Sequence, residues 1–104
     1  MIVLIYITCS NEEESRTIAE NLLKERLCGC SNIIENIKSM YWWENKIEKD
    51  NESILILKTI DDKVDEIIKR VKELHSYKNP AIIALTTFKT SDTYLEWIKN
   101  EIKQ

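Results

Sequence analysis

Hydrophobic and polar residues alternate along this chain in stretches that predict four strands and three helices. The run from Ile2 to Thr8 (IVLIYIT) is β-branched and aromatic, and it has too few polar positions for a surface helix. It therefore predicts a central strand. The run from Ala81 to Phe88 (AIIALTTF) repeats this signature and predicts a second such strand near the end of the chain.

Two longer extended stretches in the middle of the chain predict a β-hairpin. Asn32 to Trp43 and Ile47 to Thr59 flank the polar turn Glu44-Asn45-Lys46, in which Asn45 tolerates a positive φ. Polar residues from Glu48 to Ser53 interrupt the second stretch, so we expect a bulge near them.

Apolar residues spaced three and four apart predict the three helices. The first is expected to be capped by Ser10 and to stop at Gly29. The second has Asp61-Asp62 at its positive N-terminus and is expected to end at Pro80, and Ser91 begins the third. The apolar positions are Ile18, Ala19, Leu22, Leu23 and Leu27, then Val64, Ile67, Ile68, Val71 and Leu74, then Tyr94, Leu95, Trp97, Ile98 and Ile102.

The resulting order is β-α-β-β-α-β with an added C-terminal helix, and residues 1–104 are expected to form one domain. This order predicts an α+β, ferredoxin-like fold, an antiparallel sheet with its two main helices on one face. Right-handed connections should bring Cys9, the turn at Glu44 to Lys46 and the segment from His75 to Pro80 to one end of the sheet. Cys28 and Cys30 should lie at the other end.

Composition narrows the function classes. Fifteen Lys and Arg against 18 Asp and Glu give a net charge of −3, which argues against a nucleic-acid partner. A single glycine, Gly29, excludes the common glycine-rich phosphate loops. No apolar run reaches the roughly 20 residues of a membrane span, and the start of the chain does not read as a signal peptide. Three cysteines cannot all pair within one chain, so we expect a cytoplasmic protein.

Two adjacent tryptophans point to a partner. Consecutive strand residues face opposite sides of a sheet, so Trp42 and Trp43 cannot both lie under the helix layer. A buried Trp removes about 200 Å² from water, a gain that a solvated sheet face would largely forfeit. We therefore expect a partner subunit on the open face, or alternatively the last helix, which carries Trp97.

The only histidine is the main candidate for metal chemistry. His75 should lie beside Cys9, and imidazole with thiolate suits copper or zinc. Two donors are too few for a closed site, so carboxylates such as Glu44 or Glu12, water or another subunit would complete it. The alternative is a structural histidine at a helix C-terminus. With one histidine and no oxyanion loop, we expect no catalysis.

The pair Cys28 and Cys30, on either side of Gly29, resembles a thiolate clip, but this spacing is a weak metal signal. Both cysteines are expected to pack in the core where a helix meets a strand. The thiol of Cys30 is expected to be buried and inert.

Several ordered motifs together resemble the CutA family of divalent-cation tolerance proteins. They are Tyr41-Trp42-Trp43-Glu44-Asn45-Lys46-Ile47, Leu57-Lys58-Thr59, Leu74-His75-Ser76-Tyr77 with Pro80-Ala81-Ile82, Cys30-Ser31-Asn32-Ile33, and Tyr94-Leu95-Glu96-Trp97. The resemblance runs from Tyr6 to about Ile98. It implies a ferredoxin-like subunit in a tight homotrimer whose hairpin strands pair across subunits, and a role in tolerance to copper and other divalent ions.

The resemblance also implies residue roles. His75 matches the family's metal-associated histidine and Cys30 its recurrent cysteine. Positions that line or support the cleft between subunits are matched by Trp42, Trp43, Lys58, Tyr77 and Pro80, and Glu44 stands beside them. Three residues depart from the pattern: Asn45 replaces a glycine, Ser76 a proline, and Ala81 an acidic residue that could have served as a ligand.

Two functions remain in competition. The first is a cytoplasmic homotrimer that binds divalent ions, copper or zinc, weakly near His75 and Cys9, without catalysis and without an organic cofactor. The second is a regulatory module resembling the PII trimers, in which Lys58, Tyr77 and Trp43 line a cleft for a small ligand. A stable structural trimer without a specific ligand is a third reading.

Overall fold

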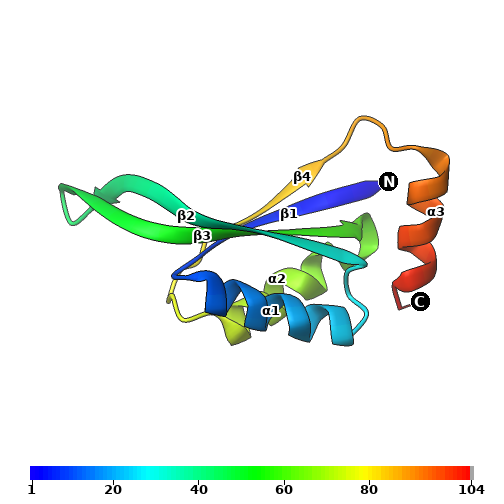
Figure 1. Ribbon diagram of the computed structural model, residues 1–104, viewed down its shortest axis with the longest axis horizontal. Coiled ribbons are helices and arrows are strands. Elements are labelled where there is room, and N and C mark those ends of the chain that lie inside the picture. The colour runs from blue at the N-terminus through cyan, green and yellow to red at the C-terminus, as the bar shows by residue number, and fades with distance from the viewer. Residues whose placement is uncertain (104) are drawn as a thin grey trace.

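The computed structural model describes residues 1–103 and confirms the ferredoxin-like arrangement (Figure 1). The four strands are β1 (Ile2–Cys9), β2 (Cys30–Trp43), β3 (Lys46–Ile60) and β4 (Ile82–Thr86). All pairs are antiparallel, in the order β2-β3-β1-β4. The helices are α1 (Glu12–Lys24), the short 3₁₀ turn η1 (Asp61–Lys63), α2 (Val64–Leu74) and α3 (Asp92–Glu101). None of the helices in residues 1–103 has the length and apolar character that a bilayer crossing requires.

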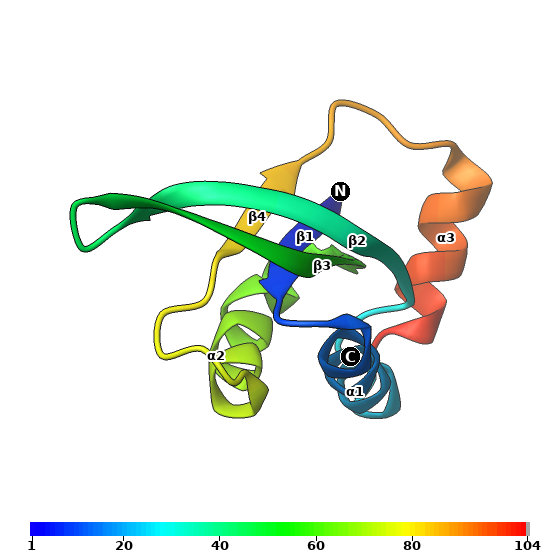
Figure 2. The same ribbon diagram turned by 60° about the vertical axis from the view of Figure 1, so that its left-hand side comes forward.

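The core lies between the sheet and the two main helices, which cover the same face (Figure 2). Alternate residues of β1 point into it, because side chains of a strand alternate between faces. These strand residues meet the apolar stripes of α1 and α2. The buried members are Val3, Ile5, Ile7, Cys9, Ile18, Ala19, Leu22, Leu27, Cys28, Leu55, Leu57, Ile67 and Val71.

The ends of α1 differ from the expectation by a few residues. Asn11, not Ser10, is the N-cap, and its side chain accepts a hydrogen bond from the Glu14 N–H. The helix stops at Lys24, well before Gly29, because Arg26 adopts a left-handed backbone with φ of 61°. Local hydrogen bonding therefore decides both ends of this helix.

The second helix and the last strand are also shorter than predicted. The chain leaves α2 at His75, whose φ of −78° and ψ of 142° are extended, so Pro80 lies beyond the helix end. An irregular segment of residues 75–81 then leads to β4, which ends at Thr86 and does not reach Phe88. This segment carries the only histidine.

The hairpin closes in a two-residue turn in which Glu44 and Asn45 have φ of 49° and 63°. The expected bulge is present, with its extra residue in β2. Ile34 pairs with Ile54 but Ile37 with Glu52, and Asn36 between them has φ of 56°.

The hairpin tip projects far from the body of the sheet (Figure 1). Cys9 pairs with Ser53, and the turn lies eight residues farther along β3, on the order of 25 Å at about 3.3 Å per residue. The prediction that the turn at Glu44 to Lys46 neighbours Cys9 is therefore wrong. The strands of the hairpin are much longer than β1, so the turn overshoots the sheet.

The third helix does not cover the tryptophans. α3 packs at the opposite end of the sheet, where Ile98 and Ile102 form a small cluster with Ile2. Trp42 and Trp43 remain 74% and 60% exposed in the single chain. The last helix is thus excluded as their cover.

Gly29 fits α3 closely against the rest of the chain. A Cβ at this position would lie 2.8 Å from Cδ1 of the fully buried Ile98. We expect Gly29→Ala to cost about 1–3 kcal/mol of stability through overpacking. In an Ile98→Val background, which removes that methyl, the added cost should fall toward zero. Denaturant unfolding of the four proteins measures this coupling, and purely additive costs would show that the contact is not the cause.

Candidate metal centre

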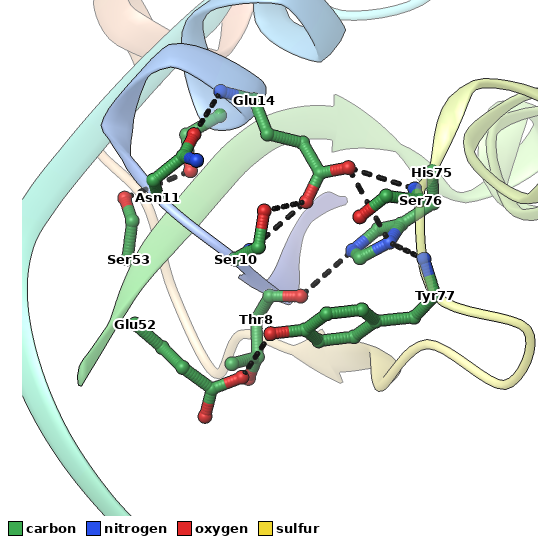
Figure 3. Close-up of polar contacts among 10 residues, drawn as sticks. Thr8, Ser10, Asn11, Glu14, Glu52, Ser53, His75, Ser76 and Tyr77 are labelled. Atoms are coloured by element: carbon green, nitrogen blue, oxygen red, sulfur yellow. Dashed lines mark hydrogen bonds and ion pairs between the residues drawn. The ribbon is translucent and has the colours of Figure 1, made fainter. Parts of the chain in front are cut away.

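Three potential metal ligands converge from three elements. Cys9 ends β1, Glu14 lies in the first turn of α1, and His75 follows the last residue of α2. One ligand atom from each lies within 4.8 Å of the others. The predicted proximity of Cys9 and His75 is therefore observed, and Glu14 joins them. Figure 3 shows the contacts around Glu14 and His75.

Both ring nitrogens of His75 are engaged. Nδ1 accepts a hydrogen bond of 3.0 Å from the Tyr77 N–H, so the ring proton resides on Nε2. Nε2 then donates to the Thr8 carbonyl oxygen at 2.8 Å. The side chain is fully buried, and its ring packs against that of Tyr77 with centroids 4.8 Å apart. In this state the imidazole is a satisfied structural group that joins α2 to the end of β1.

Glu14 brings a fixed negative charge to the cluster. One carboxylate oxygen accepts hydrogen bonds of 2.9 Å from the N–H and the hydroxyl of Ser10. The other accepts the Ser76 N–H at 2.7 Å and lies 3.8 Å from Nδ1 of His75. Burial works against the charge, but the hydrogen bonds from Ser76 and Ser10 outweigh it and lower the pKa of Glu14 to about 2. The carboxyl is therefore ionised at neutral pH.

Cys9 is protonated at neutral pH. Its side chain is fully buried. Desolvation, reinforced by the nearby charges of Glu14 and Glu52, raises the pKa of its thiol to about 11 despite a hydrogen bond with Ser15. A thiol in this state is neither a nucleophile nor a metal ligand until it loses its proton.

Tyr77 connects the cluster to the hairpin. Its hydroxyl donates a hydrogen bond of 2.6 Å to the buried carboxylate of Glu52 on β3, which pairs with the first residue of β2 beyond the bulge (Figure 3). Burial and this bond raise the pKa of the Tyr77 hydroxyl. Within residues 1–103, every buried side-chain nitrogen and oxygen has a hydrogen-bond partner. The cluster is thus complete without an ion.

The donor set suits a zinc or copper ion chemically, since thiolate, imidazole and carboxylate are common ligands of these metals. Coordination would nevertheless require Cys9 to lose its proton and His75 to give up a hydrogen bond. The arrangement therefore fits a weak site that must rearrange, not a preformed one.

The other predicted ligands and cleft residues lie elsewhere. Glu12 pairs with Arg16 on α1, and Glu44 is at the hairpin tip with Trp43. Lys58 Nζ lies 5.5 Å from the centre of the Tyr94 ring, at the end of the sheet away from Tyr77. A cleft combining Lys58, Tyr77 and Trp43 would have to draw on more than one subunit. Pro80 lies half-buried in the segment before β4.

The cysteine pair follows the expectation in part. Cys28 is buried in the main core, where desolvation raises the pKa of its thiol to about 12. Cys30 packs beside α3 at the far end of the sheet, as predicted, but it is half-buried and not fully buried. The small cluster under α3 covers less of the strand than the main core does.

The ligand that sequence reasoning missed is Glu14. It belongs to an acidic run, Glu12 to Glu14, at the start of a helix, where acidic side chains ordinarily face solvent and complement the positive end of the helix dipole. Glu14 is the third residue after the N-cap Asn11, and a side chain at this position reaches back toward the chain before the helix. Here that chain is the end of β1, so the spacing from the cap was the signal that could have identified Glu14.

Comparisons with known proteins agree on one family. Residues 3–101 match the family described as CutA1 divalent ion tolerance protein. The divalent-cation tolerance protein CutA of Pyrococcus horikoshii is 41% identical over 102 residues, which are 98% of this chain and 99% of that protein. The chain also spans 58% of the length of the chloroplastic Protein CutA 1 of Oryza sativa, with 37% identity.

Solved structures give the same result. The periplasmic divalent cation tolerance protein CutA from Archaeoglobus fulgidus superposes with a TM-score of 0.96 at 40% identity, covering 99% of this chain and 100% of that one. CutA1 from Oryza sativa superposes with a TM-score of 0.96 at 37% identity, covering 99% of this chain and 94% of that one. The family match, the relatives and the fold agree along nearly the whole chain, which therefore belongs to the CutA1 divalent ion tolerance protein family.

Proposed function

We propose that the protein is a non-catalytic divalent-cation tolerance protein that binds copper or zinc weakly, as a homotrimer in the cytoplasm. The observation that carries the metal part is the convergence of Cys9, Glu14 and His75, whose ligand atoms lie within 4.8 Å of one another. Family membership supports the role in tolerance. Three free cysteines support a reducing compartment.

Weak binding follows from the state of the donors. With a thiol pKa of about 11, ionising Cys9 at pH 7 costs about 5 kcal/mol before any bond to the metal forms. His75 must also release either the Thr8 carbonyl or the Tyr77 N–H. The fixed charge of Glu14 favours a cation beside both groups.

The trimer is supported by the apolar surface that the single chain leaves uncovered. Trp42 and Trp43 lie on opposite faces of the hairpin, and the open face of the sheet also exposes large apolar side chains, namely Ile34, Ile83 and Leu85. Monomeric soluble proteins rarely leave such surfaces open. Neighbouring copies of the chain would cover them.

Calorimetric titration of Zn²⁺ or Cu²⁺ into the purified protein tests the metal site. We expect saturable binding with one ion per chain, weakened at least about tenfold by His75→Ala and by Cys9→Ala, because each removes one of three donors. The matched control is Cys28→Ala, which removes a buried thiol at the other end of the sheet and should leave binding unchanged.

Light scattering in the same buffer establishes whether each variant keeps the wild-type mass. Unsaturable binding by the intact wild-type protein would contradict the metal site. Equal loss in Cys28→Ala and Cys9→Ala would place the effect in stability and not in ligation.

A further inference from the structure

The donors of the proposed site lie behind an irregular segment that is fastened at several points. Residues 75–81 connect α2 to β4 without regular structure. The His75 ring bonds Thr8, the Ser76 N–H bonds Glu14, and the Tyr77 hydroxyl bonds Glu52. The segment is thus attached to the end of β1, the start of α1 and the base of the hairpin (Figure 3).

The attachments through His75 and Tyr77 are buried, and the attachment through Ser76 is at the surface. The His75 side chain and the Cys9 side chain are fully buried, and Glu52 is 8% exposed. The bond from Ser76 to Glu14, by contrast, lies at the exposed side of the segment. Ser76 donates its N–H to the carboxylate at 2.7 Å, and its hydroxyl also helps to lower the pKa of Glu14. Bonds to a charged acceptor are about twice as strong as neutral ones, so this contact is a strong one for its exposed position.

We propose that residues 75–81 act as a latch over the Cys9 and His75 donors, and that the contact between Ser76 and Glu14 is the catch that holds it closed. This regulation rests on the proposed metal function of the same site. While the catch is closed, the His75 ring is held against Thr8 and the Cys9 thiol is shielded. An ion can reach both donors only after the segment has moved away from α1.

The closed latch lowers the apparent affinity for the ion. When only a fraction of molecules is open and competent to bind, the apparent dissociation constant is the intrinsic one divided by that fraction. Weakening the catch enlarges the open fraction and also releases one acceptor position on Glu14. Both effects strengthen binding, whereas a Ser76 that merely positioned Glu14 as a ligand would weaken binding when removed.

Three substitutions at one position test the latch without changing any charge. Ser76→Ala removes the hydroxyl alone, and Ser76→Pro removes the hydroxyl and the N–H together. His75 already has the extended backbone that proline requires of the residue before it. Ser76→Thr retains both donors and is the matched control.

The first readout needs no metal. The metal-free trimer is treated with iodoacetamide under native conditions, and labelling of each cysteine is followed by peptide mass. We expect Cys9 to react faster in Ser76→Ala and about tenfold faster or more in Ser76→Pro, given the strength of a bond to a charged group. Ser76→Thr should match the wild type. Cys28, buried at the other end of the sheet, serves as the internal reference and should not change.

The second readout is the Zn²⁺ affinity of the same proteins, which should rise in the order of their Cys9 reactivity. Unchanged Cys9 labelling in Ser76→Pro overturns the latch, and so does equal acceleration of Cys9 and Cys28, which would show general loosening. Faster labelling with weaker Zn²⁺ binding overturns it in favour of a positioning role. Faster labelling with no Zn²⁺ binding by any protein supports the latch and contradicts the proposed metal function.

Discussion

A chain with both Trp42→Ala and Trp43→Ala is expected to run as a monomer, in contrast to the trimer proposed for the wild type. The two indoles are 74% and 60% exposed in the single chain. Each indole side chain has about 200 Å² of surface, and burial of apolar surface contributes about 25 cal/mol per Å². Covering the exposed parts of both is therefore worth on the order of 6 kcal/mol for every subunit of the assembly. Sedimentation or light scattering measures the change.

The monomeric form should keep its own fold. Residues 41–50 are exposed in the single chain, so the substitutions remove nothing from the core between the sheet and its helices. Phe88→Ala is the control, because it removes a fully exposed aromatic ring from the loop before α3. A double tryptophan variant that stays trimeric would show that these side chains are not the main contacts between subunits.

Glu14→Gln is expected to lower the free energy of unfolding by about 3 kcal/mol at pH 7. The hydrogen bonds from Ser76 and Ser10, against the opposing effect of burial, lower the carboxyl pKa from 4.5 to about 2 in the folded chain. Each pKa unit corresponds to about 1.4 kcal/mol. The side chain is only 12% exposed, so solvent screens this interaction weakly.

The pH dependence distinguishes this charge effect from simple loss of packing. Because the folded-state pKa is the lower one, the stabilisation is fully present above about pH 4.5 and is lost as the pH falls toward 2. The stability difference between wild type and Glu14→Gln should shrink over that window in denaturant unfolding. Glu13→Gln, an exposed neighbour in the same helical turn, is the control. A difference that is independent of pH would refute the electrostatic explanation.

The sequence was sufficient for the fold because its periodicities are strong and local. The runs from Ile2 and from Ala81 mark strands with no competing helical reading, and the apolar spacings of the helices define the buried faces. The meeting of Cys9 with His75 followed from topology alone, since both lie at element ends that a right-handed connection brings together.

Details that depend on side-chain hydrogen bonds were not predictable in the same way. Asn11 rather than Ser10 caps α1, and this one-residue shift aims Glu14 at Ser76. His75 donates to the carbonyl of Thr8 and Glu14 accepts from the N–H of Ser76, and no local pattern encodes these contacts with backbone groups distant in sequence. The separation of the turn at Glu44 from Cys9 likewise depends on the length of the hairpin, which carries its turn beyond the sheet.

The bulge in β2 has a consequence for which way each tryptophan faces. Ile34 lies opposite Ile54 and Ile37 lies opposite Glu52. Both therefore lie on the face of the even-numbered β3 residues, although they are three positions apart in β2. Beyond the bulge, the even-numbered residues of β2 therefore lie on the face that the odd-numbered residues occupy before it. Trp42 accordingly shares a face with Ile47, and Trp43 with Lys46. Strict alternation outward from Ile34 would put Trp42 on the same face as Ile34, and the extra residue of the bulge puts Trp43 there instead. Deletion of Asn36 would therefore remove the bulge yet leave Trp42 opposite Ile47 and Trp43 opposite Lys46, so each indole would keep its face of the hairpin and only the local bend and twist would change.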